Sequence, residues 1–583
     1  MVALRRGVGL VLGLILVAVL VSAVGMTAAF LLVGAEPTVP SQSTVVLRLR
    51  GDLPEVEQLG VFGPFLPRRT TVRTVVESLR MAKVDRRVKS LLVVPSATPT
   101  LWAKTQEVRD AILDFKRSGK RAVAFLEFGG DQEYYVATAC DRIYLMPTSP
   151  LDVKGLASYD IFLRGTLDKV GAYPDFLHVG DYKTAINVFT ETGYTPAHRE
   201  MAESLNRDTF EQLVRGVAEG RKKSEADVRR LIDEGPFLPE EALRNGLVDE
   251  LAYADEVAAQ ARLATDDAHT VEADTYAEVS PRRLGLGRGP RIAVIYVVGT
   301  IVSGRSSATT EGEVAGSDTI AAFIRKARTD GAVKAIVVRI DSGGGSAVAS
   351  DVIWRELTLA RAKKPVVASM SDAAASGGYW VAMASHAIVA QPGTLTGSIG
   401  IFAGKIVTGG TLEKLGARIE GVSNGRLAEM GSPVRPFNEA ERAKLTEQLQ
   451  AYYDQFVERV AEARRSTPEQ IDAIAQGRVW TGRQAKELGL VDELGGLDHA
   501  VALAKQRAKI PAASEVELVV YPPRKSFYEL VSAPFAEENT IRGWLGGLLL
   551  SPEERAAVAL AGQVRRFRRG EPLALMPYVF VTR

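Results

Sequence analysis

Ser376 lies in a setting that is typical of a nucleophile. It stands between three alanines and two glycines, Gly377 and Gly378, in the stretch SDAAASGGYW. A serine placed where a strand ends and a helix begins displays its hydroxyl at the helix N-terminus, and the following backbone N–H can face a developing oxyanion. The glycines would also let a substrate come close. Acyl transfer is the chemistry that this arrangement could perform.

A second glycine cluster could complete such a site. The run DSGGGS, residues 341–346, directly follows the apolar strand pattern AIVVRI and precedes a helical pattern. Open parallel sheets bind ligands at this end of a strand, and the amides of the run could supply another oxyanion donor. Taken alone, the run is more simply a tight turn. Its coincidence with Ser376 favours the functional interpretation.

A catalytic serine needs a base, and histidine is the usual one. None of the histidines stands in a motif, and His386 is expected at the far end of the helix that follows Ser376. Ser423, in GVSNG, matches a nucleophile-elbow pattern, but no helical pattern follows it. The sequence therefore disfavours a Ser-His-Asp site. The histidines are His178, His198, His269, His386 and His499.

Lysine is the other known partner of a catalytic serine. Lys183 lies among apolar and small residues in HVGDYKTAINVF. It could take a proton if burial lowered its pKa toward neutrality, because desolvation disfavours the charged ammonium. A solvated surface lysine is the alternative, and the residues alone leave both interpretations open.

The elements that must position these residues occur twice in the chain. The stretch from Thr74, TVVESLRMAKVDRRVKSLLVVP, resembles the stretch from Thr319, TIAAFIRKARTDGAVKAIVVRI, at a separation of 245 positions. The separation later becomes 243, which pairs GLVDEL at Gly246 with GLVDEL at Gly489. Each half alternates short buried-strand patterns with helical patterns, which indicates an α/β fold.

The two halves have kept different parts of the candidate site. Asp131 stands where the second half has Ser376, and PSATPT replaces the glycine run. Conversely, Arg426 stands where the first half has Lys183, and a guanidinium cannot accept a proton. We therefore expect one site, built from the lysine of the first half and the serine of the second.

The N-terminus predicts a membrane anchor. Val8 to Gly34 runs 27 residues without a charge, which suffices to cross a bilayer as a helix of about 1.5 Å per residue. Arg5 and Arg6 precede it, so the positive-inside rule places the bulk of the chain outside the cytoplasm. A cleaved secretory signal is the alternative, disfavoured because the apolar run is long.

The composition excludes some classes of function. A formal charge of +2 over 583 residues offers no field to recruit nucleic acid. Cys140 is the single cysteine, so intrachain disulfides and thiolate metal clusters are excluded, and its apolar surroundings indicate a buried, inert thiol.

At the motifs DYKTA, AASGGYW and LTGSIGIF the chain resembles the signal peptide peptidase A (protease IV) family in its long, duplicated form. The resemblance implies Ser376 as nucleophile and Lys183 as general base, with Gly344, Gly345 and Gly377 forming the oxyanion hole. The family's Ser-Pro-Gly-Gly turn reads Ser-Gly-Gly-Gly here, and TAINVF replaces its more common Glu-Pro-Phe form. These departures affect the choice of oxyanion glycine and local substrate contacts.

The resemblance also implies an architecture: tandem Clp protease/crotonase-like α/β domains behind an N-terminal transmembrane helix. It further implies a homo-oligomer, a tetramer in the long form, anchored as a single-pass protein in a bacterial inner membrane with its catalytic bulk in the periplasm, and no metal or cofactor. The expected segments are 1–42 (stub, anchor and linker), 43–264 (lysine-bearing repeat), 265–290 (connector), 291–515 (serine-bearing repeat) and 516–583 (C-terminal extension).

The expected function is endopeptidase cleavage of released signal peptides and other apolar peptides, with Ser398 and Tyr379 beside an apolar groove. Tyr379 is equally well explained as a core residue, because Tyr134 matches it in the other half. Two alternatives stay open: a catalytically inactive envelope scaffold that binds peptides, and a crotonase-like acyl-CoA enzyme.

Overall fold

The computed structural model describes residues 16–17, 20–21, 36–56, 70–96, 100–261, 269–309, 312–523, 567, 571–576 and 581–582. The predicted anchor, Val8 to Gly34, lies almost entirely outside these residues. Within them, none of the helices combines the length and apolar character needed to cross a bilayer.

The first half is built on a parallel sheet. Its strand order is β10-β1-β2-β3-β5-β9, and every neighbouring pair is parallel. The central strands are apolar runs buried on both faces, as parallel sheets require. The strands are β1 (Ser43–Leu49), β2 (Val88–Pro95), β3 (Arg121–Leu126), β5 (Arg142–Leu145), β9 (Glu250–Leu251) and β10 (His269–Glu272).

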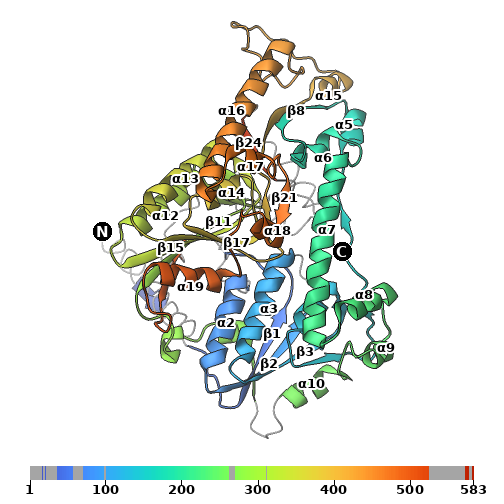
Figure 1. The fold of residues 1–583 in the computed structure, drawn as a ribbon, viewed down its shortest axis with the longest axis vertical. Coiled ribbons are helices and arrows are strands. Elements are labelled where there is room, and N and C mark those ends of the chain that lie inside the picture. Colours follow the sequence, from blue (N-terminus) through green and yellow to red (C-terminus); the bar gives the residue numbers. More distant parts are fainter. Residues whose placement is uncertain are drawn as a thin grey trace, which may run out of the picture.

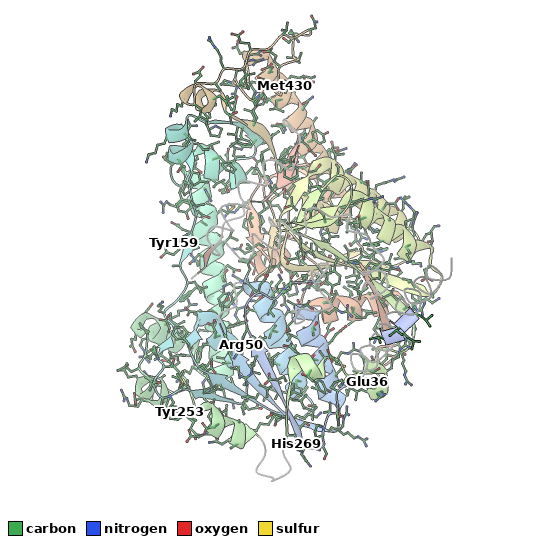
Figure 2. The ribbon with its side chains drawn as sticks, turned by 180° about the vertical axis from the view of Figure 1, so that it is seen from behind. Glu36, Arg50, Tyr159, Tyr253, His269 and Met430 are labelled. Carbon is green, nitrogen blue, oxygen red and sulfur yellow. The ribbon has the colours of Figure 1, made fainter. Side chains whose placement is uncertain are left out.

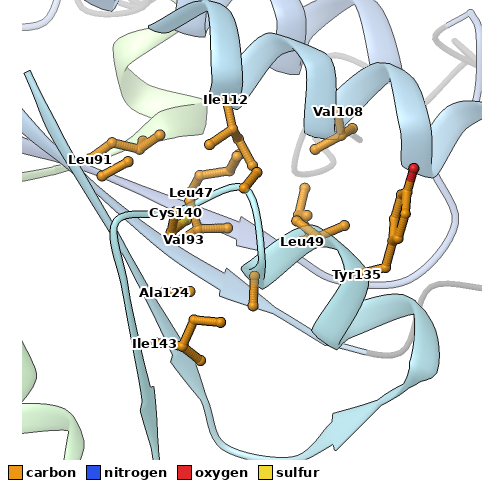
Figure 3. Packing of buried hydrophobic residues seen from close by; sticks show 14 of the residues in the cluster. Leu47, Leu49, Leu91, Val93, Val108, Ile112, Ala124, Tyr135, Cys140 and Ile143 are labelled. Atoms are coloured by element: carbon orange, nitrogen blue, oxygen red, sulfur yellow. The ribbon is translucent and has the colours of Figure 1, made fainter. Parts of the chain in front are cut away.

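Helices α2 (Val72–Val84) and α3 (Trp102–Lys116) cover one face of this sheet (Figure 1). Figure 3 shows the core between α3 and this sheet. Ile112 and Val108 of α3 face the sheet residues Leu47, Leu49, Leu91 and Val93. Cys140 is buried in this core, and burial raises the pKa of its thiol to about 12. The thiol is therefore protonated and inert at neutral pH, as predicted.

The second half repeats this sheet in the same order, β23-β11-β15-β17-β18-β22. Strands β19 (Leu395–Gly397) and β21 (Val479–Thr481) extend it from the end of β17. The matching strand order confirms the internal repeat. The strands are β11 (Arg291–Val298), β15 (Val333–Ser342), β17 (Val366–Ala375), β18 (Ala387–Ala390), β22 (Glu493–Leu494) and β23 (Glu517–Tyr521).

The long helices of the two halves correspond as well. Helices α7 (Pro196–Arg221) and α16 (Glu439–Arg464) are both 26 residues long. Thr195 caps α7 by accepting the His198 N–H, and Asn438 and Glu441 form a capping box on α16. Figure 1 shows that α7, a helix of the first half, lies alongside elements of both halves.

A third sheet joins the two halves, with the order β13-β14-β12-β16-β24-β20-β8. Its β8 (Tyr173–Val179) comes from the first half and pairs antiparallel with β20 (Ile401–Val407) of the second, from Val179 opposite Ile401 to Tyr173 opposite Val407. The remaining strands are β12 (Thr300–Val302), β13 (Ser307–Thr309), β14 (Gly312–Gly316), β16 (Gly344–Ser346) and β24 (Leu573–Leu575).

The structure shifts two of the expected segment boundaries. The connector 265–290 contains β10, an edge strand of the first sheet, and the extension 516–583 contains β23 and β24. Strand β10 reads HTVE, with one buried residue of four, so its sequence carries no strong strand pattern. Figure 2 shows the molecule from behind, with Met430 of the second half at one end and Tyr253 of the first half at the other.

Candidate active site

Ser376 occupies the sharp turn between β17 and the short helix α14 (Gly377–Ala382). Its backbone has φ 55° and ψ −113°, a conformation that non-glycine residues rarely adopt. The Ser376 N–H donates to the Gly397 carbonyl at 2.8 Å, and its own carbonyl accepts the Trp380 N–H at 2.8 Å. These bonds hold the strained residue in place, and such strain concentrates at functional sites.

Lys183 reaches this serine from the other half of the chain. The pairing of β8 with β20 carries the chain to Lys183, and the Tyr182 N–H then donates to the Gln476 carbonyl at 2.9 Å. The Lys183 Nζ lies 2.8 Å from the Ser376 Oγ, and both side chains are fully buried. The structure thus brings together two residues that are 193 positions apart.

Two glycines make room for the lysine. A Cβ on Gly477, whose φ is +79°, would lie 2.5 Å from the Lys183 Cα. A Cβ on Gly400 would lie 3.1 Å from the Lys183 Cδ. Both glycines belong to the second half, so this half provides a slot shaped for the first half's lysine. Gly400 lies within the motif LTGSIGIF, whereas no motif of the sequence contains Gly477.

The surroundings of Lys183 favour an uncharged amine. Burial lowers the pKa of Lys183 well below its usual value. Its Nζ also lies 3.0 Å from both the carbonyl oxygen and the Oγ of Ser398. A neutral amine has two N–H donors and one lone pair. It can therefore donate to the two Ser398 oxygens and accept the Ser376 hydroxyl proton.

The three predicted oxyanion glycines lie together, although their contributions differ. A Cβ on Gly344 would lie 2.6 Å from the Gly377 nitrogen, so the two turns adjoin. The Gly344 N–H donates to the Ser342 Oγ at 3.1 Å, which engages that amide within its own turn. Gly344, with φ +104°, therefore contributes space, and the predicted oxyanion donors that remain are the amides of Gly345 and Gly377.

Ser398 and Tyr379, the two predicted substrate contacts, lie against the Lys183 amine and in the second core, respectively. Ser398 is fully buried against the Lys183 amine and contacts the base. Tyr379 is buried in the second core, where its hydroxyl donates to the Leu490 carbonyl at 2.9 Å. Tyr134 makes the equivalent bond to Leu247 at 2.7 Å in the first half. These matching bonds favour the alternative interpretation of Tyr379, a packing residue common to both halves.

The rejected candidates lie elsewhere. The Nδ1 of His386 accepts the Val366 N–H at 3.0 Å, at the opposite end of β17 from Ser376. Ser423 and Arg426 are exposed in the irregular segment after α15 (Gly409–Lys414). In the first half, Asp131 begins helix α4 (Asp131–Ala137), and burial raises its pKa to about 7.

A buried ionic cluster supports the strand ends next to the site, and sequence reasoning missed it. Lys104 of α3 lies 2.8 Å from Asp341 and 3.6 Å from Asp372. Asp341 accepts the Ala373 N–H at 3.2 Å, and Asp372 accepts backbone N–H groups of the first half. Burial raises the pKa of Asp372 to about 6, against the effect of Lys104. The cluster fixes the ends of β15 and β17 relative to the first half.

Comparison with known proteins identifies the family. The model of peptidase family S49 matches this chain twice, at residues 114–267 and 358–511. The chain belongs to peptidase family S49. The two S49 matches fall in the two structural repeats. The site therefore combines a lysine from the first S49 region with a serine from the second.

Curated S49 relatives extend over most of the chain. It is 34% identical over 487 residues to the chloroplastic serine protease SPPA of Arabidopsis thaliana. This alignment covers 82% of this chain and 72% of that protein. It is 36% identical to Protease 4 of Salmonella typhi, covering 75% of this chain and 72% of that protein. Among solved structures, a ClpP1 mutant of Listeria monocytogenes aligns at 15% identity over 36% of this chain and 94% of its own, with a TM-score of 0.24.

Proposed function

We propose that this chain is a serine endopeptidase that uses a Ser376–Lys183 dyad. The observation that carries the proposal is the 2.8 Å contact between a buried lysine amine, whose pKa is strongly lowered, and the hydroxyl of a strained serine. A serine hydroxyl becomes an effective nucleophile when an adjacent base can accept its proton.

The mechanism follows from this geometry. Neutral Lys183 takes the Ser376 proton while Oγ attacks a peptide carbonyl, and the amides of Gly345 and Gly377 stabilise the oxyanion. The lysine then returns the proton to the departing amine, which leaves an acyl-enzyme. Water, deprotonated by the same amine, hydrolyses this ester and regenerates the serine.

The proposed substrates are released signal peptides and other apolar peptides. Two apolar clusters flank the dyad, one next to Ala375 and Tyr182 and the other around Ile186 and Phe402. The names of the relatives, serine protease SPPA and Protease 4, support a protease. We further propose that Val8 to Gly34 anchors a homo-oligomer in a bacterial inner membrane, with the catalytic bulk in the periplasm.

The test is hydrolysis of a quenched apolar peptide by the purified full chain. Ser376→Ala and Lys183→Met should each lower kcat by about a thousandfold or more, because members of a catalytic unit act together. Lys334→Ala, which alters an exposed lysine, should leave turnover unchanged. Loss of turnover in only one of the two dyad variants would refute the pairing.

The same preparation separates the alternatives. Turnover of an acyl-CoA thioester without peptide hydrolysis would indicate the crotonase-like enzyme. Peptide binding with no hydrolysis, and no labelling of Ser376 by a serine-reactive probe, would indicate the inactive scaffold.

A further inference from the structure

A short segment near the C-terminus lies in the candidate site. Residues Leu573–Leu575 form β24, which lies between β16 and β20 in the third sheet (Figure 1). Ala574, Leu575 and Met576 are buried. The mechanism proposed above assigns no role to this segment, although it contacts the oxyanion glycines.

The segment binds as an added antiparallel strand. Leu573, Ala574 and Leu575 pair with Ser346, Gly345 and Gly344, respectively. The Met576 N–H donates to the Gly343 carbonyl at 2.7 Å, and the Ala347 N–H donates to the Pro572 carbonyl at 3.2 Å. Addition of an extended peptide to a sheet edge is a general mode of peptide recognition, in which main-chain bonds provide affinity.

The Ala574 carbonyl lies at the oxyanion glycines. A Cβ on Gly344 would lie 2.0 Å from the Ala574 oxygen, and a Cβ on Gly377 would lie 3.0 Å from it. A carbonyl that Ser376 attacks must place its oxygen against these glycines, because the oxyanion forms there. The Ala574 carbonyl oxygen therefore lies where we expect the oxygen of a scissile carbonyl to lie.

The side chains of the segment occupy apolar sites formed by both halves. Met576 packs in the cluster that contains Met201 and Leu205 of the first half and Leu395 and Val479 of the second. Leu575 packs with Ile186 and Phe402, and Leu573 lies against the same cluster. Ala574 is fully buried, so a small side chain fits next to the glycines.

We propose that Glu571–Met576 is an internal peptide ligand of the catalytic groove, and that peptide substrates must displace it. The proposal rests on the function proposed above for the identity of the groove. It also specifies the substrate class: an extended peptide with a small residue whose carbonyl faces Gly344 and Gly377, and with apolar residues such as leucine or methionine on the leaving side.

A binding experiment tests the proposal in the full chain. The probe is a fluorescein-labelled peptide with the sequence of residues 571–577, EPLALMP. Its affinity is measured by fluorescence polarisation in the Ser376→Ala background, so that cleavage does not interfere. Leu573→Asp combined with Met576→Asp should release the internal segment, because the bound state would bury one carboxylate and place the other against apolar side chains. The probe should then bind at least tenfold more tightly.

The matched control is Leu238→Asp, the same change at an exposed leucine at the start of helix α9 (Pro239–Arg244). It should leave probe affinity unchanged. If the double variant fails to fold, a site-specific protease site inserted before residue 571 allows the segment to be cut from the folded chain and washed away. The same tenfold gain is expected, and unchanged affinity after removal of the segment would overturn the proposal.

The two proposals fail in different ways. Tighter probe binding in the double variant, together with absent peptide hydrolysis by the wild-type chain, would refute the peptidase and retain the internal ligand. Hydrolysis that depends on Ser376, with equal probe affinity in all variants, would refute the internal ligand alone.

Discussion

At the scale of residues, the site requires that the Lys183 amine is uncharged and oriented toward the Ser376 hydroxyl. Burial lowers the pKa of Lys183, and Ser398 supplies two oxygens that orient its N–H groups. The lone pair that remains then points to the Ser376 hydroxyl. The strained backbone of Ser376 fixes the other partner, so little rearrangement is needed before proton transfer.

Ser398→Ala tests this orienting contact. The variant removes one acceptor of the amine and leaves the backbone carbonyl. We expect kcat to fall about tenfold to a hundredfold, within the range of general-base effects, with KM nearly unchanged. Steady-state kinetics on the quenched peptide measures both constants, and Ser41→Ala at an exposed position is the control. An unchanged kcat would contradict the orienting role.

At the scale of elements, the pairing of β8 with β20 delivers the lysine to the serine. The loop that contains Gly477 then closes over Lys183. Glycine is needed at this position for two reasons: its φ is positive, and the backbone of Lys183 is in direct contact with it. The position of the base therefore depends on a glycine 294 residues further along the chain than the lysine itself.

Gly477→Ala should displace Lys183 and lower kcat/KM at least a hundredfold, since small misplacements of a catalytic group cost about that much. It should also destabilise the fold by about 1 to 3 kcal/mol through backbone strain. Gly331→Ala is the matched control, because nothing lies within 4 Å of its added Cβ. Peptidase assays and thermal melts compare the two. Equal activity would show that the slot tolerates a side chain.

Much of this arrangement could be predicted from sequence. The repeat gave the order of elements in each half, and the absence of a serine in one half and a lysine in the other predicted a shared site. Strand β24 could not be predicted, because LAL is too short to carry a pattern. Nor could the inter-half partners of Lys104 or the slot formed by Gly477, since both depend on how the two halves dock. Tyr379 was ambiguous because its neighbourhood resembles both a core helix and a groove.

At the scale of the whole molecule, a buried ion cluster holds the halves together. Arg339 of β15 lies 2.7 Å from Glu55 and 2.6 Å from Glu107 of the first half, and all three side chains are buried. Burial alone would raise the pKa of Glu55, but Arg339 holds it below the usual value. Glu107 also accepts the Leu497 N–H at 2.8 Å, so its removal deprives two buried donors, on Arg339 and Leu497, of an acceptor.

Glu107→Ala should therefore destabilise the protein by about 2 to 4 kcal/mol, because buried donors left without an acceptor are costly, most of all when one of them is charged. Glu203→Ala removes an exposed carboxylate of an i,i+4 pair on α7 and should cost at most about 0.5 kcal/mol. Urea denaturation of both variants measures the difference. A similar small effect at both positions would show that the buried cluster does not join the halves.

The repeat also predicts assembly. Residues 416–422 correspond to β8, yet they and the adjoining Leu415 are exposed in the single chain. A head-to-tail contact, in which this segment pairs with the first half of another copy, would repeat the pairing of β8 with β20 between chains. We expect light scattering to show an oligomer that Ile419→Asp with Val422→Asp dissociates. A wild-type monomer would contradict this prediction.

Activation of Ser376 by an uncharged Lys183 can be tested by the rate at which a fluorophosphonate labels Ser376 across pH. Because the pKa of Lys183 is lowered in the folded protein, the amine loses its proton as pH rises through that lowered value, and wild-type labelling should rise and then level off well below pH 10.5. Lys183→Met should label about a thousandfold more slowly, without this ionisation. Equal rates and coincident pH profiles in the two proteins would show that Lys183 does not activate Ser376.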